Sequence, residues 1–60
     1  MAGKFEVYQD ARSEYRWRLK AANGQTIATS GEGYTTKQSC LNGIDSVKSN
    51  APEAEVVEAS

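Results

Sequence analysis

Three basic residues alternate along one short segment of this 60-residue chain: Arg16, Arg18 and Lys20. Side chains two residues apart in a β-strand point to the same face, so these cations would form a row. Tyr8, on a neighbouring segment, would add a ring on which a base could stack, as in sheets that bind nucleic acid. The commoner arrangement is a solvated sheet face on which Glu6 pairs with Arg18. The candidate binding face therefore consists of Tyr8, Arg16, Arg18 and Lys20.

A glycine-containing loop provides a weaker candidate, for an anion. Residues 31–37 (GEGYTTK) lead into a predicted helix, whose free N–H groups can hold a phosphate. The contacts would come from Gly33, Thr35 and Thr36. The loop lacks the spacing of a P-loop, and Glu32 adds an unfavourable charge. The glycines are more simply explained by the turn from strand to helix.

Catalytic and metal-binding residues have no candidate arrangement in this sequence. It contains no histidine and a single cysteine, Cys40, so it lacks the usual base for a nucleophile, a zinc site and an internal disulfide. Cys40 falls in an apolar stripe and is predicted to be a small buried hydrophobe. We expect no enzyme activity, cofactor or metal. The remaining carboxylates lie on predicted exposed surfaces, without an apolar pocket that would suit them to acid–base work: Asp45, Glu53, Glu55 and Glu58.

The composition is that of a small folded chain. Hydrophobic residues make up 38% and charged residues 25%, with a net charge of −1, which indicates neither disorder nor general binding of polyanions. Residues 1–30 carry five basic and three acidic residues (+2), and residues 31–60 carry two and five (−3). Complementary halves suit self-association. Without an apolar secretion signal or membrane span, we expect a cytoplasmic protein, with which the lone cysteine agrees.

The elements that would position these residues follow the order β-β-β-α-β in one domain, residues 1–60. Alternating apolar and polar residues predict three strands. Helical spacing then predicts one helix, and a valine pair predicts a short last strand. One helix covers one face of an antiparallel sheet and leaves the other face open. The expected bounds are 4–9, 14–20 and 25–30 for the strands, 36–49 for the helix and 54–58 for the last strand.

The hairpin connections decide which residues share the core face. A three-residue first loop, 11–13, keeps the apolar residues of both strands on one side. Asn23-Gly24 marks the second turn, and a two-residue turn there would expose Ile27. We therefore predict a three-residue loop, 22–24, with Gly24 in the left-handed conformation. The predicted pairs are Phe5 with Leu19, Glu6 with Arg18, Val7 with Trp17, Ile27 with Leu19, and Thr29 with Trp17.

Thr35 and Gln38 have the spacing of a capping box that begins the helix. Inside the helix, Gly43 costs about 1 kcal/mol relative to Ala. Close approach of the sheet or of a partner helix is the expected reason for it. A chain of this size usually needs a disulfide, a metal or a partner to be stable, and only the partner remains. The short connector Ala51-Pro52-Glu53 is the kind of hinge that favours exchange of a strand between copies.

The resemblance of this chain to a known family is carried by four stretches, which are 3–8 (GKFEVY), 15–24 (YRWRLKAANG), 27–34 (IATSGEGY) and 39–44 (SCLNGI). In this order they closely resemble the YegP-like family of small bacterial proteins, from residue 3 to about residue 57. The resemblance implies a β-β-β-α-β unit that pairs with a second copy in one continuous sheet, with the C-terminal strands exchanged. The family carries no established activity.

Together, the residues and the resemblance predict an α+β, strand-swapped homodimer that acts as a non-enzymatic binding or protein-interaction module. Its protein partner is unidentified, and no membrane partner is expected. Binding of RNA or single-stranded DNA through the candidate binding face is the alternative.

Overall fold

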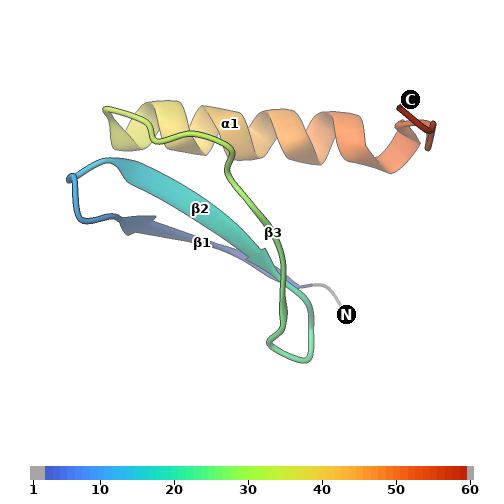
Figure 1. Cartoon of the computed structure of the whole chain (residues 1–60), viewed down its shortest axis with the longest axis horizontal. Helices are drawn as coiled ribbons and strands as arrows, with labels where there is room; N and C mark the ends of the chain where they lie inside the picture. The colour runs from blue at the N-terminus through green and yellow to red at the C-terminus, as the bar shows by residue number, and fades with distance from the viewer. Residues whose placement is uncertain (1–2, 60) are drawn as a thin grey trace.

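The computed structural model describes residues 3–59 as a three-stranded antiparallel sheet with one helix on one face, which confirms the α+β class (Figure 1). The central strand is β2, so β1 and β3 each have one outer edge that pairs with no other described strand. None of the described helices is long and apolar enough to span a bilayer. The elements are β1 (Lys4–Gln9), β2 (Tyr15–Lys20), β3 (Thr26–Thr29), α1 (Lys37–Asn50) and the 3-10 helix η1 (Ala51–Glu53).

The first hairpin has the predicted register, because Phe5 lies opposite Leu19, Glu6 opposite Arg18 and Val7 opposite Trp17. Its apolar side chains therefore face α1, where Trp17, Cys40 and Ile44 form the buried core. The Phe5 ring meets Trp17 edge to face, with ring centres 5.3 Å apart. Half-buried apolar residues surround this core: Val7, Tyr15, Leu19, Tyr34 and Val47.

The second hairpin has the predicted loop but a different register. Ala21 N–H donates to the carbonyl of Gln25 at 2.8 Å, and Gly24 has a φ of 90°, as a three-residue loop requires. Beyond it, the ladder shifts between Lys20 and Leu19, so that Leu19 lies opposite Ala28 rather than Ile27. Ile27 is thus the extra residue of a β-bulge and is 61% exposed.

The bulge also moves the predicted pair of Thr29 and Trp17 apart, since Thr29 lies opposite Arg18. Ser30 takes the place beside Trp17, and it is buried. The backbone N–H of Ser30 donates to the Trp17 carbonyl at 2.9 Å, and the Ser30 hydroxyl accepts the backbone N–H of Trp17 at 3.3 Å. The two predicted pairs of β3 are therefore wrong, because a buried serine that satisfies the central strand displaces the larger residues.

The helix begins one residue later than predicted. Its N-cap is Thr36, whose Oγ1 accepts the N–H of Ser39 at 3.1 Å, so the predicted capping box of Thr35 and Gln38 is wrong. The same side-chain geometry is simply shifted by one position, which a run of two threonines permits. The helix accordingly spans Lys37–Asn50 rather than 36–49.

Gly43 has a close neighbour, as predicted, but the neighbour is a tyrosine from the loop before the helix. A Cβ built on Gly43 would lie 2.5 Å from the Tyr34 hydroxyl oxygen. Backbone hydrogen bonds in both directions between Tyr15 and Tyr34, each 2.8 Å, hold that loop to the start of β2. The glycine therefore makes room for the side chain that connects α1 to the sheet.

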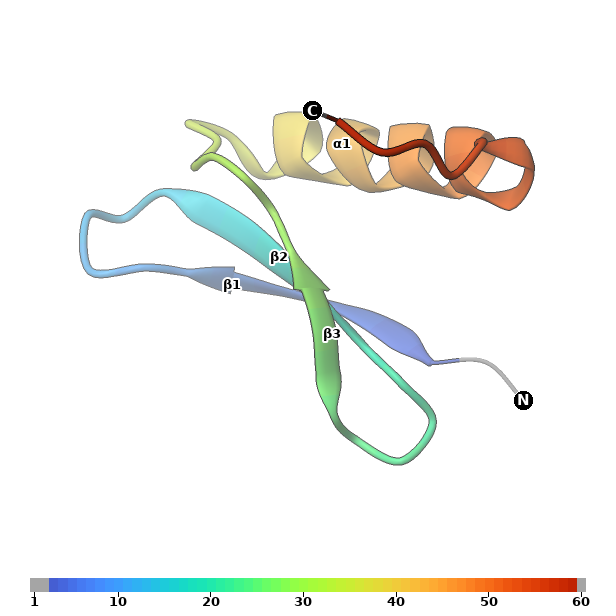
Figure 2. The ribbon, with the colours of Figure 1, turned by 45° about the vertical axis from the view of Figure 1, so that its right-hand side comes forward.

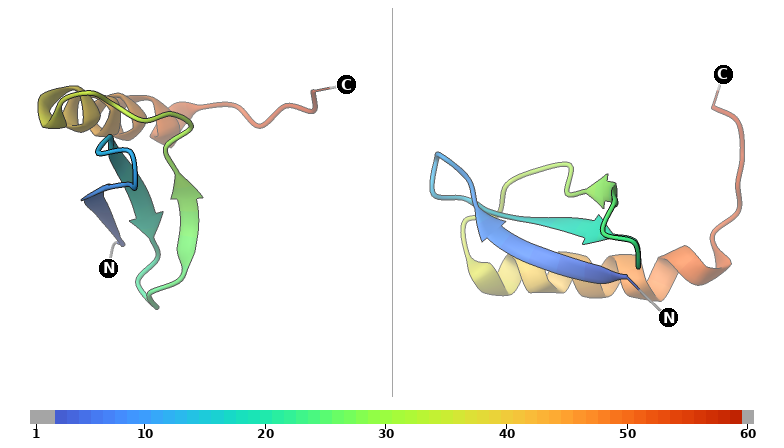
Figure 3. Two further views of the ribbon diagram at one scale, coloured as in Figure 1. Left: turned by 60° about the vertical axis from the view of Figure 1, so that its left-hand side comes forward. Right: turned by 90° about the horizontal axis from the view of Figure 1, so that it is seen from below.

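The predicted strand at 54–58 does not form within the described chain. After η1, where Ala54 N–H donates to the Ala51 carbonyl at 3.2 Å, the chain is extended and makes no ladder. Val56 and Val57 are 99% and 72% exposed. Figures 2 and 3 show that this segment, after the end of α1, lies beside none of the three strands.

Candidate functional site

The candidate binding face lies on the side of the sheet opposite α1. Tyr8 pairs with Arg16 across the first hairpin, and Arg18 is their neighbour on the same face. The guanidinium carbon of Arg18 lies 4.4 Å from the centre of the Tyr8 ring, a cation–π contact. Tyr8 is half-buried. The ring that was expected to offer a stacking surface is thus already stacked against an arginine of its own chain.

Glu6 forms ion pairs with three basic side chains of this face. Its Oε1 accepts the Arg18 Nε–H at 2.9 Å and lies 3.8 Å from Lys20 Nζ, while Oε2 lies 3.7 Å from Lys4 Nζ. The hydrogen bond from Arg18, helped by the charge of Lys20, holds the pKa of Glu6 below its ordinary value of 4.5. The predicted pairing of Glu6 with Arg18 is confirmed.

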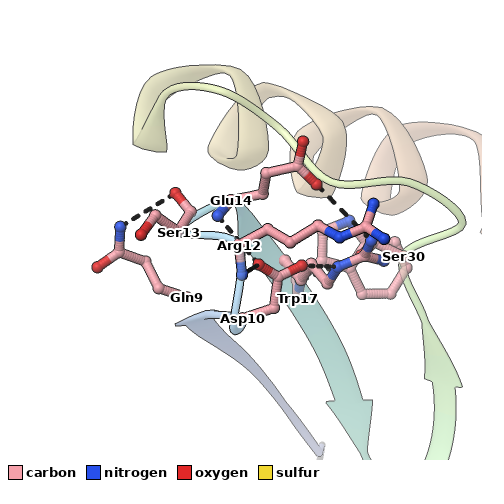
Figure 4. Close-up of polar contacts among 8 residues, drawn as sticks. Gln9, Asp10, Arg12, Ser13, Glu14, Trp17 and Ser30 are labelled. Atoms are coloured by element: carbon pink, nitrogen blue, oxygen red, sulfur yellow. Dashed lines mark hydrogen bonds and ion pairs between the residues drawn. The ribbon is translucent and has the colours of Figure 1, made fainter.

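Arg16 forms a hydrogen bond with Asp10, and Figure 4 shows Asp10 among the residues of the first loop. Arg16 Nε–H donates to Asp10 Oδ2 at 2.6 Å, while Oδ1 accepts the backbone N–H groups of Arg12 at 2.8 Å and Glu14 at 3.0 Å. The pKa of Asp10 is therefore lowered, first by the Arg16 hydrogen bond and then by the Glu14 N–H, and the pKa of Arg16 is raised. Sequence reasoning missed Asp10, although an aspartate opening a tight turn is a recognisable signal.

These contacts make the face a surface of mixed charge rather than a free row of cations. Both arginines hold a carboxylate, and the lysine lies within ion-pair distance of one. Such pairs are partly exposed and individually weak. Their combined effect is to order the side chains of the face and to reduce the charge that an anionic ligand would meet.

The loop that was expected to hold an anion lies against an acidic side chain of the same protein. Gly33 packs against the side chain of Glu14, where a Cβ would overlap it, so a carboxylate lies beside the loop. Thr36 uses its hydroxyl in the helix cap, and Thr35 is exposed. The predicted contacts Gly33, Thr35 and Thr36 are adjacent, but the negative charge of Glu14 opposes an anion between them.

Cys40 is fully buried beneath the sheet, and burial raises the pKa of its thiol. It packs with Trp17 and Ile44 in the core. Among residues 3–59 there is no cluster of three or more His, Cys, Asp or Glu side chains that could hold a metal ion. The side-chain clusters that the structure does assemble are the ion pairs of the sheet face.

Comparison with known proteins places this architecture in a family. A model described as "Domain of unknown function (DUF1508)" matches residues 10–58. A UPF0339 protein of Treponema denticola is 59% identical over 97% of this chain and 98% of its own length. UPF0339 protein YegP of Escherichia coli O157:H7 is 53% identical over 92% of this chain, which spans 49% of YegP. The resemblance to YegP is thereby confirmed.

Two solved structures share the fold. The solution structure of a protein from Haloferax volcanii is 55% identical, covers 97% of both chains and superimposes with a TM-score of 0.89. Protein ATU0232 from Agrobacterium tumefaciens is 48% identical and covers 93% of this chain and 89% of its own, with a TM-score of 0.77. Identities this high make the fold of this chain that of its relatives.

Proposed function

Because the chain belongs to the DUF1508 (UPF0339) family, a domain of unknown function, we propose a role from its structure: a non-enzymatic homodimer that serves as a protein-interaction module. In this proposal each copy donates residues 54–58 to the sheet of the other. The open sheet face, with its ordered Tyr8 and Arg18, is then available on each side of the dimer for a protein partner.

The observation that carries the proposal is the exposure of the C-terminal valines. Val56 is 99% and Val57 is 72% exposed, on an extended segment whose described residues are all exposed. Two adjacent valines flanked by Glu55 and Glu58 have the composition of a half-buried strand. Burying them in a second copy would add apolar contact to a small core, which contains three buried hydrophobic residues.

The connector supports exchange between copies rather than folding back. Pro52 fixes its own φ within η1, and Ala54 continues in an extended conformation with φ −72° and ψ 136°. The connector therefore directs the segment away from the sheet of its own copy. A short, stiff hinge of this kind favours a swapped dimer over a closed monomer.

The alternative, nucleic-acid binding, is disfavoured by the ion pairs of the face. Phosphate would have to displace Asp10 from Arg16 and Glu6 from Arg18, and a base would have to displace Arg18 from Tyr8. Titration with RNA and single-stranded DNA at low salt separates the two functions, since phosphate binding must weaken as salt is added. Salt-dependent binding that disappears in Arg16→Ala/Arg18→Ala would favour the alternative.

Sedimentation equilibrium at micromolar concentration tests the dimer. We expect a mass of twice the 6.5 kDa of one chain, and a chain ended after Glu53 should sediment as a single copy. A full chain that stays at 6.5 kDa would refute the proposal. For the interaction role, a protein retained from lysate by the full chain and lost with Tyr8→Ala/Arg18→Ala is the expected result, with Asp45→Ala on the exposed side of α1 as the control.

A further inference from the structure

The open sheet face carries an excess of positive charge at one of its two ends. At the loop end, Arg16 lies within ion-pair distance of two carboxylates, those of Asp10 at 2.6 Å and Glu14 at 3.9 Å. At the opposite end, the ion pairs of the described residues give three basic side chains one carboxylate, that of Glu6. This basic end consists of Lys4, Glu6, Arg18 and Lys20. Three positive charges and one negative charge leave it a net charge of +2.

The strand register brings two of these cations together. Lys4 lies directly opposite Lys20 in the first hairpin. Like charges in directly opposed positions of an antiparallel pair are destabilising. Gly3 keeps the chain close at this point, because a Cβ on it would overlap the Lys20 carbonyl. The backbone therefore places the two lysine side chains side by side, where a further negative charge would offset their repulsion.

The two lysines also retain hydrogen-bond donors that Glu6 does not engage. The Glu6 oxygens lie 3.7 Å from Lys4 Nζ and 3.8 Å from Lys20 Nζ, which is beyond hydrogen-bond length. Arg18 Nε–H, by contrast, donates to Glu6 at 2.9 Å. The side chain of Lys4 is 71% exposed and that of Lys20 is 30% exposed. Carboxylates from outside could accept from both lysines without displacing Glu6 from Arg18.

We propose that the basic end binds an acidic segment of a protein partner, with one carboxylate accepting from each lysine. This inference rests on the proposed interaction role of the open face and adds the chemistry of the partner. A protein carboxylate fits this end better than nucleic acid does. A base would have to displace Arg18 from the Tyr8 ring, and a phosphate backbone would meet Arg16 already paired with Asp10.

The neighbouring strand adds polar groups to the basic end without adding negative charge. Thr26 lies opposite Lys20 and Thr29 lies opposite Arg18, so both threonines share the open face. Both are exposed, and a hydroxyl can donate to a carboxylate oxygen. The sequence of β3, TIAT, contains no acidic residue. An acidic segment lying across the sheet would therefore meet donors from all three strands.

An NMR titration of the ¹⁵N-labelled full chain with a short polyglutamate peptide at low salt tests this inference. We expect the largest shift changes at residues 4–6 and 18–20, and they should diminish as salt is added. A polyglutamine peptide of the same length is the control and should cause none. Absence of shifts at millimolar peptide, or shifts centred on α1, would overturn the inference. Tighter binding of an oligothymidylate of equal charge at the same residues would overturn it in favour of nucleic acid.

Charge-matched variants provide an independent measurement. Lys4→Gln/Lys20→Gln should raise the dissociation constant of the polyglutamate peptide by about fivefold. Lys37→Gln/Lys48→Gln makes the same change of net charge at exposed positions of α1 and should change the constant by less than about twofold. Equal effects of the two double substitutions would contradict a site at the basic end. The ¹⁵N spectrum of each variant reports whether it stays folded.

Glu6→Gln has an expected effect of the opposite sign. It removes the carboxylate that competes for the lysines, so the polyglutamate peptide should bind more tightly, and weaker binding would contradict the inference.

Failure of this inference is distinguishable from failure of the proposed function. A lysate protein that is lost with Tyr8→Ala/Arg18→Ala but retained by Lys4→Gln/Lys20→Gln would preserve the interaction role and overturn the acidic segment.

Discussion

Asp10 uses both carboxylate oxygens within its own hairpin. One oxygen accepts two backbone N–H groups of the loop, and the other accepts Arg16 at 2.6 Å. An amide side chain could keep the first role, because its oxygen also accepts, but it would lose the charge that attracts Arg16. The carboxylate therefore connects the shape of the loop to the order of the open sheet face.

The first prediction concerns the contribution of Asp10 to the pH dependence of the free energy of unfolding. Its folded pKa lies below the ordinary 3.8, so its stabilising effect is complete above that value and is lost as pH falls through the folded pKa. Asp10→Asn should lower the free energy of unfolding near neutral pH and flatten its decline in acid. Urea denaturation followed by Trp17 fluorescence measures both. Asp45→Asn, on exposed α1, makes the same change of net charge, and an equal effect there would contradict the prediction.

A second prediction concerns Ser13, whose φ of 65° places a non-glycine residue in the left-handed region. A branched side chain is strained there, so Ser13→Val should lower the free energy of unfolding by about 1–2 kcal/mol. Ser13→Gly should be as stable as the wild type or slightly more so, since relief of strain is partly offset by the entropy of glycine. Chemical denaturation of the two variants measures their free energies of unfolding. Equal stability of the two variants would count against strain at this position.

At the scale of single elements, the two adjacent threonines before α1 offer a third prediction. Thr36→Ala should reduce the free energy of unfolding by about 1 kcal/mol, because its hydroxyl caps the helix by accepting the Ser39 N–H. Thr35→Ala serves as the matched control, since Thr35 is exposed and is not the N-cap. Thermal or urea unfolding of both variants provides the measurement. A larger loss in Thr35→Ala would support the capping box that the sequence predicts.

The three strands show where sequence reasoning succeeds and where it ends. Apolar and polar residues alternate strictly in β1 and β2. One register places all the core-facing residues of the two strands on one side of the sheet, so the first hairpin is predictable. These residues are Phe5, Val7, Trp17 and Leu19. In β3 only Ile27 is a large apolar residue, and the register depends on whether Thr29, as predicted, or Ser30 lies beside Trp17. That choice is made by a hydrogen bond between Ser30 and the backbone of the central strand, which periodicity does not reveal.

The candidate site is predictable to the same extent. The alternation of Arg16 and Arg18 places them on one face with Tyr8, and cross-strand pairing predicts the Glu6–Arg18 contact. The capture of Arg16 by Asp10 depends on the path of the first loop, and that path is determined by hydrogen bonds to backbone groups. Residue types in the sequence therefore locate the face, whereas the loop geometry decides how much of its charge is free.

At the scale of the whole molecule, α1 and the three strands leave exposed one chain segment and one sheet edge of the kind that a stable domain usually covers. One is the apolar C-terminal segment, and the other is the edge of β3 with Ile27. In the described copy the segment extends outward from the end of α1 and does not cover this edge (Figure 3). In the proposed dimer, a second copy would cover the C-terminal segment, so that more apolar surface would be buried than in a single copy.

The fourth prediction follows from the proposed dimer, because unfolding of a dimer into two chains depends on concentration. The melting temperature of the full chain should rise by about 5 °C for each tenfold increase in protein concentration. Val56→Ser/Val57→Ser should remove this dependence and lower the melting temperature, since the exchanged segment loses its apolar side chains. Lys37→Ser/Asp45→Ser, on exposed positions of α1, is the matched double control and should retain the dependence. Circular dichroism melts over a hundredfold range of concentration measure it. A melting temperature of the wild type that stays constant over that range would show that the single copy is the folding unit.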